Sequence, residues 1–425
     1  MFQTLKVSLK DEEIRKRLLF TFLMLIVFRL GNAIPIPFID RAVIAEQMAA
    51  HEDGIFSLLN LLSGGSLARM SVFALSIYPY ITASIIIQLL TVAIPRLEEV
   101  ARDGEQGRKK IASYTKFGAV FLGLFEGYAI VQGLFGNAIV DKSTTATIIM
   151  LLSVLAGTMF LVWLGEVITQ NGVGNGISII IFLGIVSSFP NQIAQINQQR
   201  VMYGLEWWRV ALLIVLSIII LVIVVAITQG ERRIPVQYAK RVVGRKMYGG
   251  QSTHIPVKVN MAGVMPVIFA SSLLTLPQTI ALFIGQDKMP KWFAHVFTVN
   301  TTSGLVIYSI VQLLLIILFA YFYTAIQFNT VEYAKNLQQY GGFIPGIRPG
   351  RPTGEYLQKI SNRITFIGAL SLALVSSAPM LLTKLLGVQI VFGGTSIIIV
   401  VGVVLETLKQ MESMVTMRHY KGFLR

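Results

Sequence analysis

The sequence predicts an all-α polytopic membrane protein with ten transmembrane helices. Of its 425 residues, 54% are hydrophobic and only 13% are charged, about half the charged fraction that is usual in soluble domains. Apolar stretches long enough to cross a bilayer recur along the whole chain. No segment between them is long enough for a separate soluble domain. The ten predicted spans are Leu18–Phe38, Val72–Ile94, Phe117–Gly136, Ala146–Glu166, Gly176–Phe189, Trp207–Gln229, Ala262–Gly285, Ser303–Ala325, Ile364–Leu386 and Val388–Leu408.

The first span follows a charged segment, Met1–Arg17, without a small-residue cleavage site, which indicates an uncleaved span instead of a signal peptide. Ten spans place both termini on one side of the membrane. The two termini and the loops after spans two, four, six and eight hold 27 of the 36 Lys and Arg residues. The positive-inside rule therefore places the termini and these loops in the cytoplasm.

The stretch around the second span is predicted to form a broken helix. Ile55, Leu58, Leu59 and Leu62 have helical spacing, but the segment Ile55–Leu62 is too short to cross a bilayer. Gly64-Gly65 ends it, and Ser66 is a natural N-cap for the span that follows. Irregular backbone of this kind fits a protein-lined cavity, and a surface linker or interfacial helix is the alternative.

The fifth span is short and follows the glycine-rich stretch Asn171–Ser178. This stretch lacks the lysine and the preceding strand of a phosphate loop, so we interpret it as a turn that begins the span. Two charges, Arg29 and Glu126, lie inside spans one and three. Because charges within a membrane are usually paired, the sequence predicts an ion pair between them, with a role in proton relay as the less favoured alternative.

Two cytoplasmic loops, Gly230–Met261 and Gln327–Arg363, are long enough to project from the membrane. The first is strongly basic, and the second contains a tight turn at Gly341–Gly350 with Arg348 at its tip. Such loops fit anionic lipid headgroups, or an acidic partner such as RNA or a soluble motor protein. The residues leave these alternatives open. The bases of the first loop are Arg232, Arg233, Lys240, Arg241, Arg245, Lys246 and Lys258.

No cofactor and no enzymatic activity are predicted. The chain has no cysteine, its four histidines are far apart in sequence, and no nucleophile–base motif occurs. The ten spans divide into two halves, 1–200 and 201–425, and because five is odd the halves would have opposite orientations. A secondary transporter built from inverted repeats is thus one possible function on these grounds alone.

Several long motifs, in order along nearly the whole chain, resemble the SecY family of protein-conducting channels. They are Leu25–Gly31 with Ile34–Pro37 (LIVFRLG, IPIP), Ser63–Arg69 (SGGSLAR), Pro79–Leu90 (PYITASIIIQLL), Gly174–Phe182 (GNGISIIIF), Gln251–Val264 (QSTHIPVKVNMAGV), Phe343–Gly350 (FIPGIRPG) and Phe392–Ser396 (FGGTS).

The resemblance implies two inverted halves around an hourglass pore in a bacterial plasma membrane. It implies a ring of aliphatic side chains at the narrowest point, and carrying the family register onto this sequence gives Ile77, Ile81, Ile181, Ile268 and Ile399. It also implies a plug over residues 55–65, with Ile55, Phe56, Leu58, Leu59, Leu62, Gly64 and Gly65. An aliphatic midplane disfavours the transporter, which would place polar binding groups there.

The resemblance further implies a lateral gate at spans two, seven and eight, through which signal sequences and nascent membrane segments reach lipid. The two long loops would dock the SecA motor ATPase and the ribosome. Implied partners within the membrane are SecE, SecG and anionic lipids. The implied docking residues are Arg241, Arg245, Lys246, Arg348 and Arg351.

Overall fold

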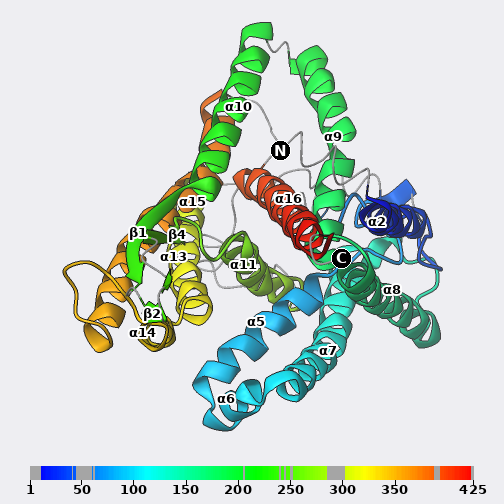
Figure 1. Cartoon of the computed structure of the whole chain (residues 1–425). Helices are drawn as coiled ribbons and strands as arrows, with labels where there is room; N and C mark the ends of the chain where they lie inside the picture. The colour runs from blue at the N-terminus through cyan, green and yellow to red at the C-terminus, as the bar shows by residue number, and fades with distance from the viewer. Residues whose placement is uncertain are drawn as a thin grey trace.

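The computed structural model describes residues 11–40, 42–44, 60, 63–203, 206–238, 241–243, 246–248, 252–284, 302–386 and 393–422. It is mostly helical, as the sequence predicts. Figure 1 shows helices α5, α6 and α7 at the bottom, α16 in the centre, and α9 and α10 meeting at the top. Strands β1 and β4 lie on the left with α13, α14 and α15.

Each of the ten predicted spans falls on a helix. The helices are α2 (Glu12–Gly31), α5 (Tyr78–Ala93), α7 (Gly104–Tyr128), α8 (Thr144–Asn171), α9 (Gly176–Tyr203), α10 (Trp207–Gln229), α11 (Met265–Ile284), α13 (Thr302–Gln327), α15 (Arg351–Leu386) and α16 (Gly394–Gly422). Within the described ranges, seven helices are long and apolar enough to cross a membrane, or eight if α5 and α6 (Pro95–Arg102) are one bent span.

The second span begins later than predicted. Ser66 does not cap a helix, and residues 63–77 form turns before α5 begins at Tyr78. Tertiary backbone bonds compete with the helix here, because the N–H of Val72 donates to Ile34 and the N–H of Ile36 donates to Met70. At the other end, α5 bends by 104° into α6. Pro95 forces the preceding Ile94 into an extended conformation, which ends the helix.

The fifth span is longer than predicted. Helix α9 continues through Pro190 to Tyr203 and has 28 residues, so most of the predicted outer loop is helical. Proline removes one backbone donor but does not forbid helix on both sides of it. The turn predicted before this span is confirmed, since the side chain of Asn175 accepts hydrogen bonds from the N–H groups of Ile177 and Ser178.

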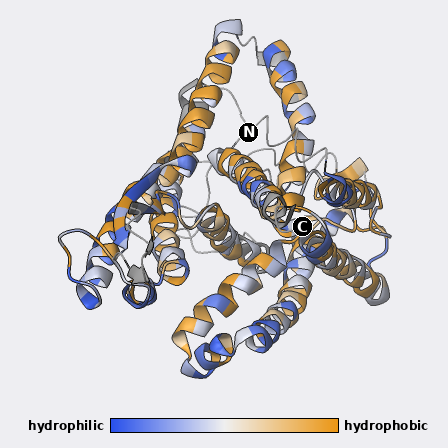
Figure 2. Cartoon of the chain, viewed as in Figure 1, coloured by the Kyte–Doolittle hydropathy of each residue, from blue (hydrophilic) through white to orange (hydrophobic). Residues whose placement is uncertain are grey.

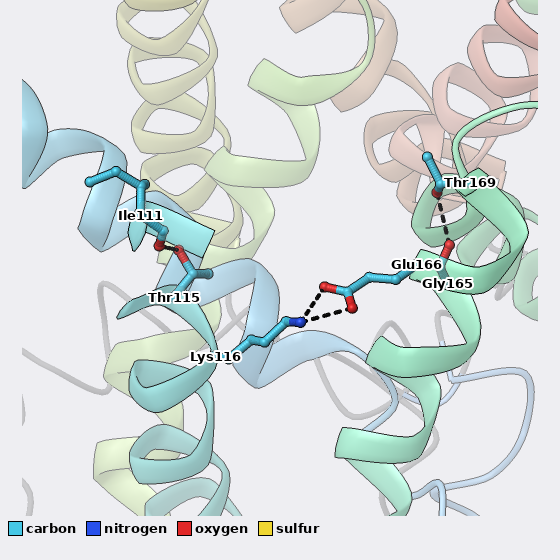
Figure 3. A network of polar contacts seen from close by, with 6 residues as sticks. All are labelled: Ile111, Thr115, Lys116, Gly165, Glu166 and Thr169. Atoms are coloured by element: carbon cyan, nitrogen blue, oxygen red, sulfur yellow. Dashed lines mark hydrogen bonds and ion pairs between the residues drawn. The ribbon is translucent and has the colours of Figure 1, made fainter. Parts of the chain in front are cut away.

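Helices α7 and α8 are joined by an ion pair that the sequence analysis missed. The Lys116 ammonium lies 2.8 Å from the Glu166 carboxylate, with both side chains about one-third exposed (Figure 3). The Thr169 hydroxyl nearby donates to the Gly165 carbonyl and accepts from the N–H of Gly176. The end of α8 is thereby tied both to α7 and to the start of α9.

The predicted ion pair between Arg29 and Glu126 does not form. Arg29 is exposed on α2, whereas Glu126 is 5% exposed within α7. Helix α2 packs against α8 and α9, which keeps the two charges apart. Three residues after Glu126, helix α7 changes into a π-helix, η1 (Ala129–Leu134), and then a 3-10 turn, η2 (Gly136–Ala138).

The two long loops fold together, which the all-α prediction did not include. Strand β1 (Glu231–Tyr238) pairs antiparallel with β4 (Ser252–Lys258), and also with β5 (Gly342–Phe343) of the second loop. A short hairpin, β2 (Arg241–Val243) and β3 (Lys246–Tyr248), extends the first loop. Helix α14 (Thr330–Gln339) packs against β5 and α15.

Candidate functional site

The centre of the molecule is a cavity lined by the five isoleucines of the predicted ring. Ile77 immediately precedes α5 and Ile81 lies in its first turn, whereas Ile181 comes from α9, Ile268 from α11 and Ile399 from α16. All five are at most 7% exposed and belong to the central hydrophobic core. We call these five residues the isoleucine ring. Segments far apart in the sequence therefore converge on one aliphatic constriction.

The cavity is narrow. The volume in it that the centre of a water molecule can occupy is about 20 Å³, which is room for one or two waters. A polypeptide in any conformation needs far more space. The ring is thus closed in this structure, and its aliphatic walls give a small enclosed water few polar partners.

Hydroxyl groups also line this cavity, beside the isoleucine ring. Ser271 and Ser272 follow Ile268 by about one turn of α11, and Thr395 precedes Ile399 by about one turn of α16. The lining of the cavity therefore combines an aliphatic ring with a few hydroxyl groups from the same helices.

A second cavity adjoins the first and shares Ser76 and Tyr78 with it. It is lined by Glu126 of α7, Ile130 of η1, and Thr275 and Thr279 of α11. The hydroxyl of Tyr78 is buried beside the hydroxyls of Ser272 and Thr275. Glu126 stands out in the sequence as a charge within a span, but the polar cluster around it could not be predicted, because its members come from three separate stretches of the chain.

Helices α5, α11 and α13 form a wall beside the cavity, in which α11 packs against both α5 and α13. Aromatic rings connect α11 to α13, since Phe269 lies 5.8 Å from Phe319 and 5.1 Å from Tyr323 between ring centroids. The Tyr323 hydroxyl of α13 donates a 2.5 Å hydrogen bond to the side-chain oxygen of Gln88 on α5. Sequence reasoning missed this bond, which joins residues 235 positions apart.

The predicted plug is only partly described. Ile55, Phe56, Leu58, Leu59 and Leu62 lie outside the described residues. Gly64 and Gly65 have φ angles of +69° and +82°, a left-handed conformation that glycine adopts without strain. A Cβ on Gly64 would lie 3.0 Å from the backbone of Gly184 in α9. The two glycines therefore form a tight turn directly against the helix that supplies Ile181.

The basic loops form a single folded unit, which we call the basic platform: strands β1, β4 and β5, helix α14 and the loop 344–350. A small hydrophobic core holds it together, with Ile234 and Val236 of β1 packed against Leu337, Ile344 and Leu357. Figure 2 shows this region as largely hydrophilic beside the apolar helices. The platform is anchored on the first turns of α15, whose apolar part enters the membrane.

Arg348 is exposed at the tip of the platform and makes no ion pair among the described residues. Its carbonyl accepts a hydrogen bond from Thr353, and Gly346 and Gly350 take φ angles of +81° and +94° that shape the turn. Arg351 is 90% exposed and pairs with Glu355. Arg241 and Lys246 lie on β2 and β3, where only the backbone is described, and Arg245 lies outside the described residues.

Nothing in this arrangement resembles a catalytic centre. In the part of the chain that the structure describes, no three His, Asp or Glu side chains gather into a group that could hold a metal ion. Membrane-spanning helices around a closed aliphatic constriction, with a projecting basic platform on one side, define a membrane channel.

Comparisons with known proteins support this class. The SecY family model matches residues 71–408. The protein translocase subunit SecY of Streptomyces galbus is 46% identical over 98% of both chains, and that of Bacillus subtilis is 43% identical over the full length of both. A solved protein-conducting channel superposes with a TM-score of 0.67 at 17% identity, covering 95% of this chain and 93% of that one. A channel from a canine ribosome complex gives 0.61 at 16% identity, with the same coverage.

The chain belongs to the SecY family. It is a translocation channel subunit, a multi-pass membrane protein that conducts polypeptides and is not an enzyme.

Proposed function

We propose that this chain passes unfolded secretory polypeptides across a bacterial plasma membrane through the isoleucine ring. The observation that carries the proposal is the convergence of five isoleucines from α5, α9, α11 and α16 on one narrow cavity. Aliphatic side chains form no directional bonds, so they suit a pore that must accept any sequence. The same side chains exclude ions from the idle channel because a narrow apolar constriction dewets.

A photocrosslinking experiment tests the ring directly. A benzophenone amino acid at Ile81 or Ile268 is expected to form an adduct with a secretory chain that is stalled halfway through transport. The matched control is Ile185, which is 0% exposed in the same core on α9 but does not line the cavity. Robust transport without an adduct at either ring position, or an equal adduct at Ile185, would refute the proposal that polypeptides pass through the isoleucine ring.

The wall formed by α5, α11 and α13 serves as a lateral gate in this proposal. Parting α5 from α13 would open the cavity toward lipid. An apolar signal sequence or membrane segment would then leave the channel sideways, favoured by about 25 cal/mol for each Å² of apolar surface removed from water. The bond between Gln88 and Tyr323 crosses this gate and must break when it opens.

Tyr323→Phe is expected to let weakly hydrophobic signal sequences open the gate more easily. Losing one intramolecular hydrogen bond changes a two-state equilibrium by roughly 0.5–1.5 kcal/mol, or about two- to tenfold. Export of a reporter with a shortened apolar signal should rise by that factor. Tyr321→Phe is the control, because the Tyr321 hydroxyl on the same helix bonds to Asn362 of α15 and does not cross the gate. Equal export by both variants would contradict the proposal that the hydrogen bond between Gln88 and Tyr323 holds the gate closed.

The basic platform is the proposed docking site for the SecA motor ATPase and the translating ribosome. Supporting features are its fold as one unit and the exposed Arg348, which forms no ion pair among the described residues. The sequence adds three bases in the same loop, Arg241, Arg245 and Lys246. The driving force comes from these partners. The platform and both termini would lie in the cytoplasm, as the distribution of Lys and Arg indicates.

The remaining assignments complete the proposed assembly. Residues 1–200 and 201–425 form two inverted halves, SecE clamps them, and SecG and anionic lipids bind at the periphery. Residues 55–65 form a plug that closes the outer side of the isoleucine ring. The tight turn at Gly64 and Gly65, packed on α9, supports this placement because it holds the segment beside the helix that carries Ile181.

A further inference from the structure

The tip of the hairpin between α9 and α10 carries two arginines stacked on two tryptophans. The guanidinium carbon of Arg200, near the end of α9, lies 4.2 Å from the centroid of the Trp207 ring. The guanidinium carbon of Arg209 lies 5.5 Å from the Trp208 ring, within the first turn of α10. Both distances fall within the range of cation–π attraction. The pair between Arg200 and Trp207 also joins the two helices at this tip.

The length of α10 sets the depth of this cluster. Its 23 residues rise by about 35 Å, slightly more than the roughly 30 Å hydrocarbon core of a bilayer. At its far end, Gly230 leads directly into strand β1 of the basic platform. Trp207 and Trp208 are therefore at the headgroup level of the opposite leaflet. They are 67% and 54% exposed, as expected for aromatic residues at a membrane interface.

Arg200 has no anionic partner among the described residues of the protein. Its Nε is buried without a hydrogen-bond acceptor, and no ion pair in the described ranges includes it. Glu206, the next carboxylate along the chain, accepts a hydrogen bond from the Trp208 indole N–H. A guanidinium binds phosphate through two parallel N–H donors. At headgroup depth, the phosphates available are those of phospholipids.

We propose that the α9–α10 tip is a binding site for a phospholipid phosphate, held by Arg200 and Arg209 between the interfacial rings of Trp207 and Trp208. The inference rests on the membrane-spanning fold and not on the proposed roles of the ring or the platform. Below the tip, α9 and α10 diverge and pass on either side of α16 (Figure 1). A lipid bound by both arginines would tie the two helices together where the two proposed halves of the chain meet.

Native mass spectrometry tests the site. Delipidated full-length protein is titrated with phosphatidylglycerol, and the lipid that remains bound is counted. The double variant R200Q/R209Q is expected to bind the first lipid at least tenfold more weakly than the wild type. K142Q is the matched control, because it removes an exposed cation from another loop on the same side of the membrane. Undiminished binding by R200Q/R209Q, or an equal loss in K142Q, would overturn the proposal.

Two further measurements distinguish a lipid site from a site for free anions and fix the depth of the tip. Excess inorganic phosphate should not displace the lipid, and displacement would identify a site for free anions instead. With Trp163 and Trp292 replaced by phenylalanine, the only tryptophans left are the two at the tip. Their fluorescence should be quenched more by lipids brominated near the headgroup than by lipids brominated near the chain end. Stronger quenching by lipids brominated near the chain end would place the tip in the hydrocarbon core and contradict its position at the headgroups.

Discussion

Arg348→Glu is expected to lower motor-driven transport by at least a hundredfold while the folded protein remains in the membrane. Arg348 is exposed at the tip of the basic platform, and no carboxylate of the described residues pairs with it. Its charge is therefore available to a partner. Reversing the charge replaces an attraction with a repulsion at the centre of the proposed interface, which costs several kcal/mol. Transport of a secretory precursor into membrane vesicles measures the effect.

The fold should tolerate this change. The Arg348 backbone carbonyl, not its side chain, accepts the hydrogen bond from Thr353, so the loop keeps its structural contact in the variant. Lys359→Glu is the matched control, because Lys359 is exposed on the adjoining turns of α15 and carries the same charge. Full transport by Arg348→Glu, or an equal defect in both variants, would argue against a specific docking role.

Ile81→Asn combined with Ile268→Asn should raise the ion conductance of the idle channel at least tenfold. Both side chains line the narrow cavity, one from α5 and the other from α11. An apolar constriction resists ions because water withdraws from it. Two amide side chains would restore hydrogen-bonding partners for water in the cavity and thus a continuous water path. Single-channel recordings of the purified protein in planar bilayers measure the change.

The control for this variant keeps the apolar character of the ring. Ile81→Leu combined with Ile268→Leu conserves volume and should leave the conductance low, since such exchanges are well tolerated in packed interiors. If the leucine variant leaks as much as the asparagine variant, the seal depends on shape and not on dewetting. If neither variant leaks, the ring is not the ion barrier of the idle channel.

Hydropathy predicted the helices well, because apolar length is a strong local signal. Their ends were predicted less well, since they depend on contacts between distant segments. The backbone bonds between Val72 and Ile34 and between Ile36 and Met70 delay α5, and nothing local indicates them. The alternation of Ile234, Val236 and Tyr238 was a readable strand signal. The strand was not predicted because the many basic residues of this loop were interpreted only as a charged surface.

The site was likewise predicted where motifs carry it and missed where it depends on contacts between distant segments. Motif register placed five isoleucines, and the structure brings all five to one cavity, although no residue-level pattern alone distinguishes them from other isoleucines in the spans. The predicted pair of Arg29 and Glu126 was wrong because pairing was inferred from composition without knowing which helices are neighbours. The contacts of Gln88 with Tyr323 and of Lys116 with Glu166 likewise require the tertiary arrangement.

The origin of the isoleucine ring in four separate elements has a mechanical consequence. Only Ile77 and Ile81 belong to one segment, at the start of α5, so the others can move apart without breaking any backbone hydrogen bond of a helix. The diameter of the opening can therefore change continuously, and the segment that occupies it sets that diameter. A thin extended chain and a bulky helical segment would each be gripped closely. Leakage around the cargo would stay small across a wide range of cargo diameters.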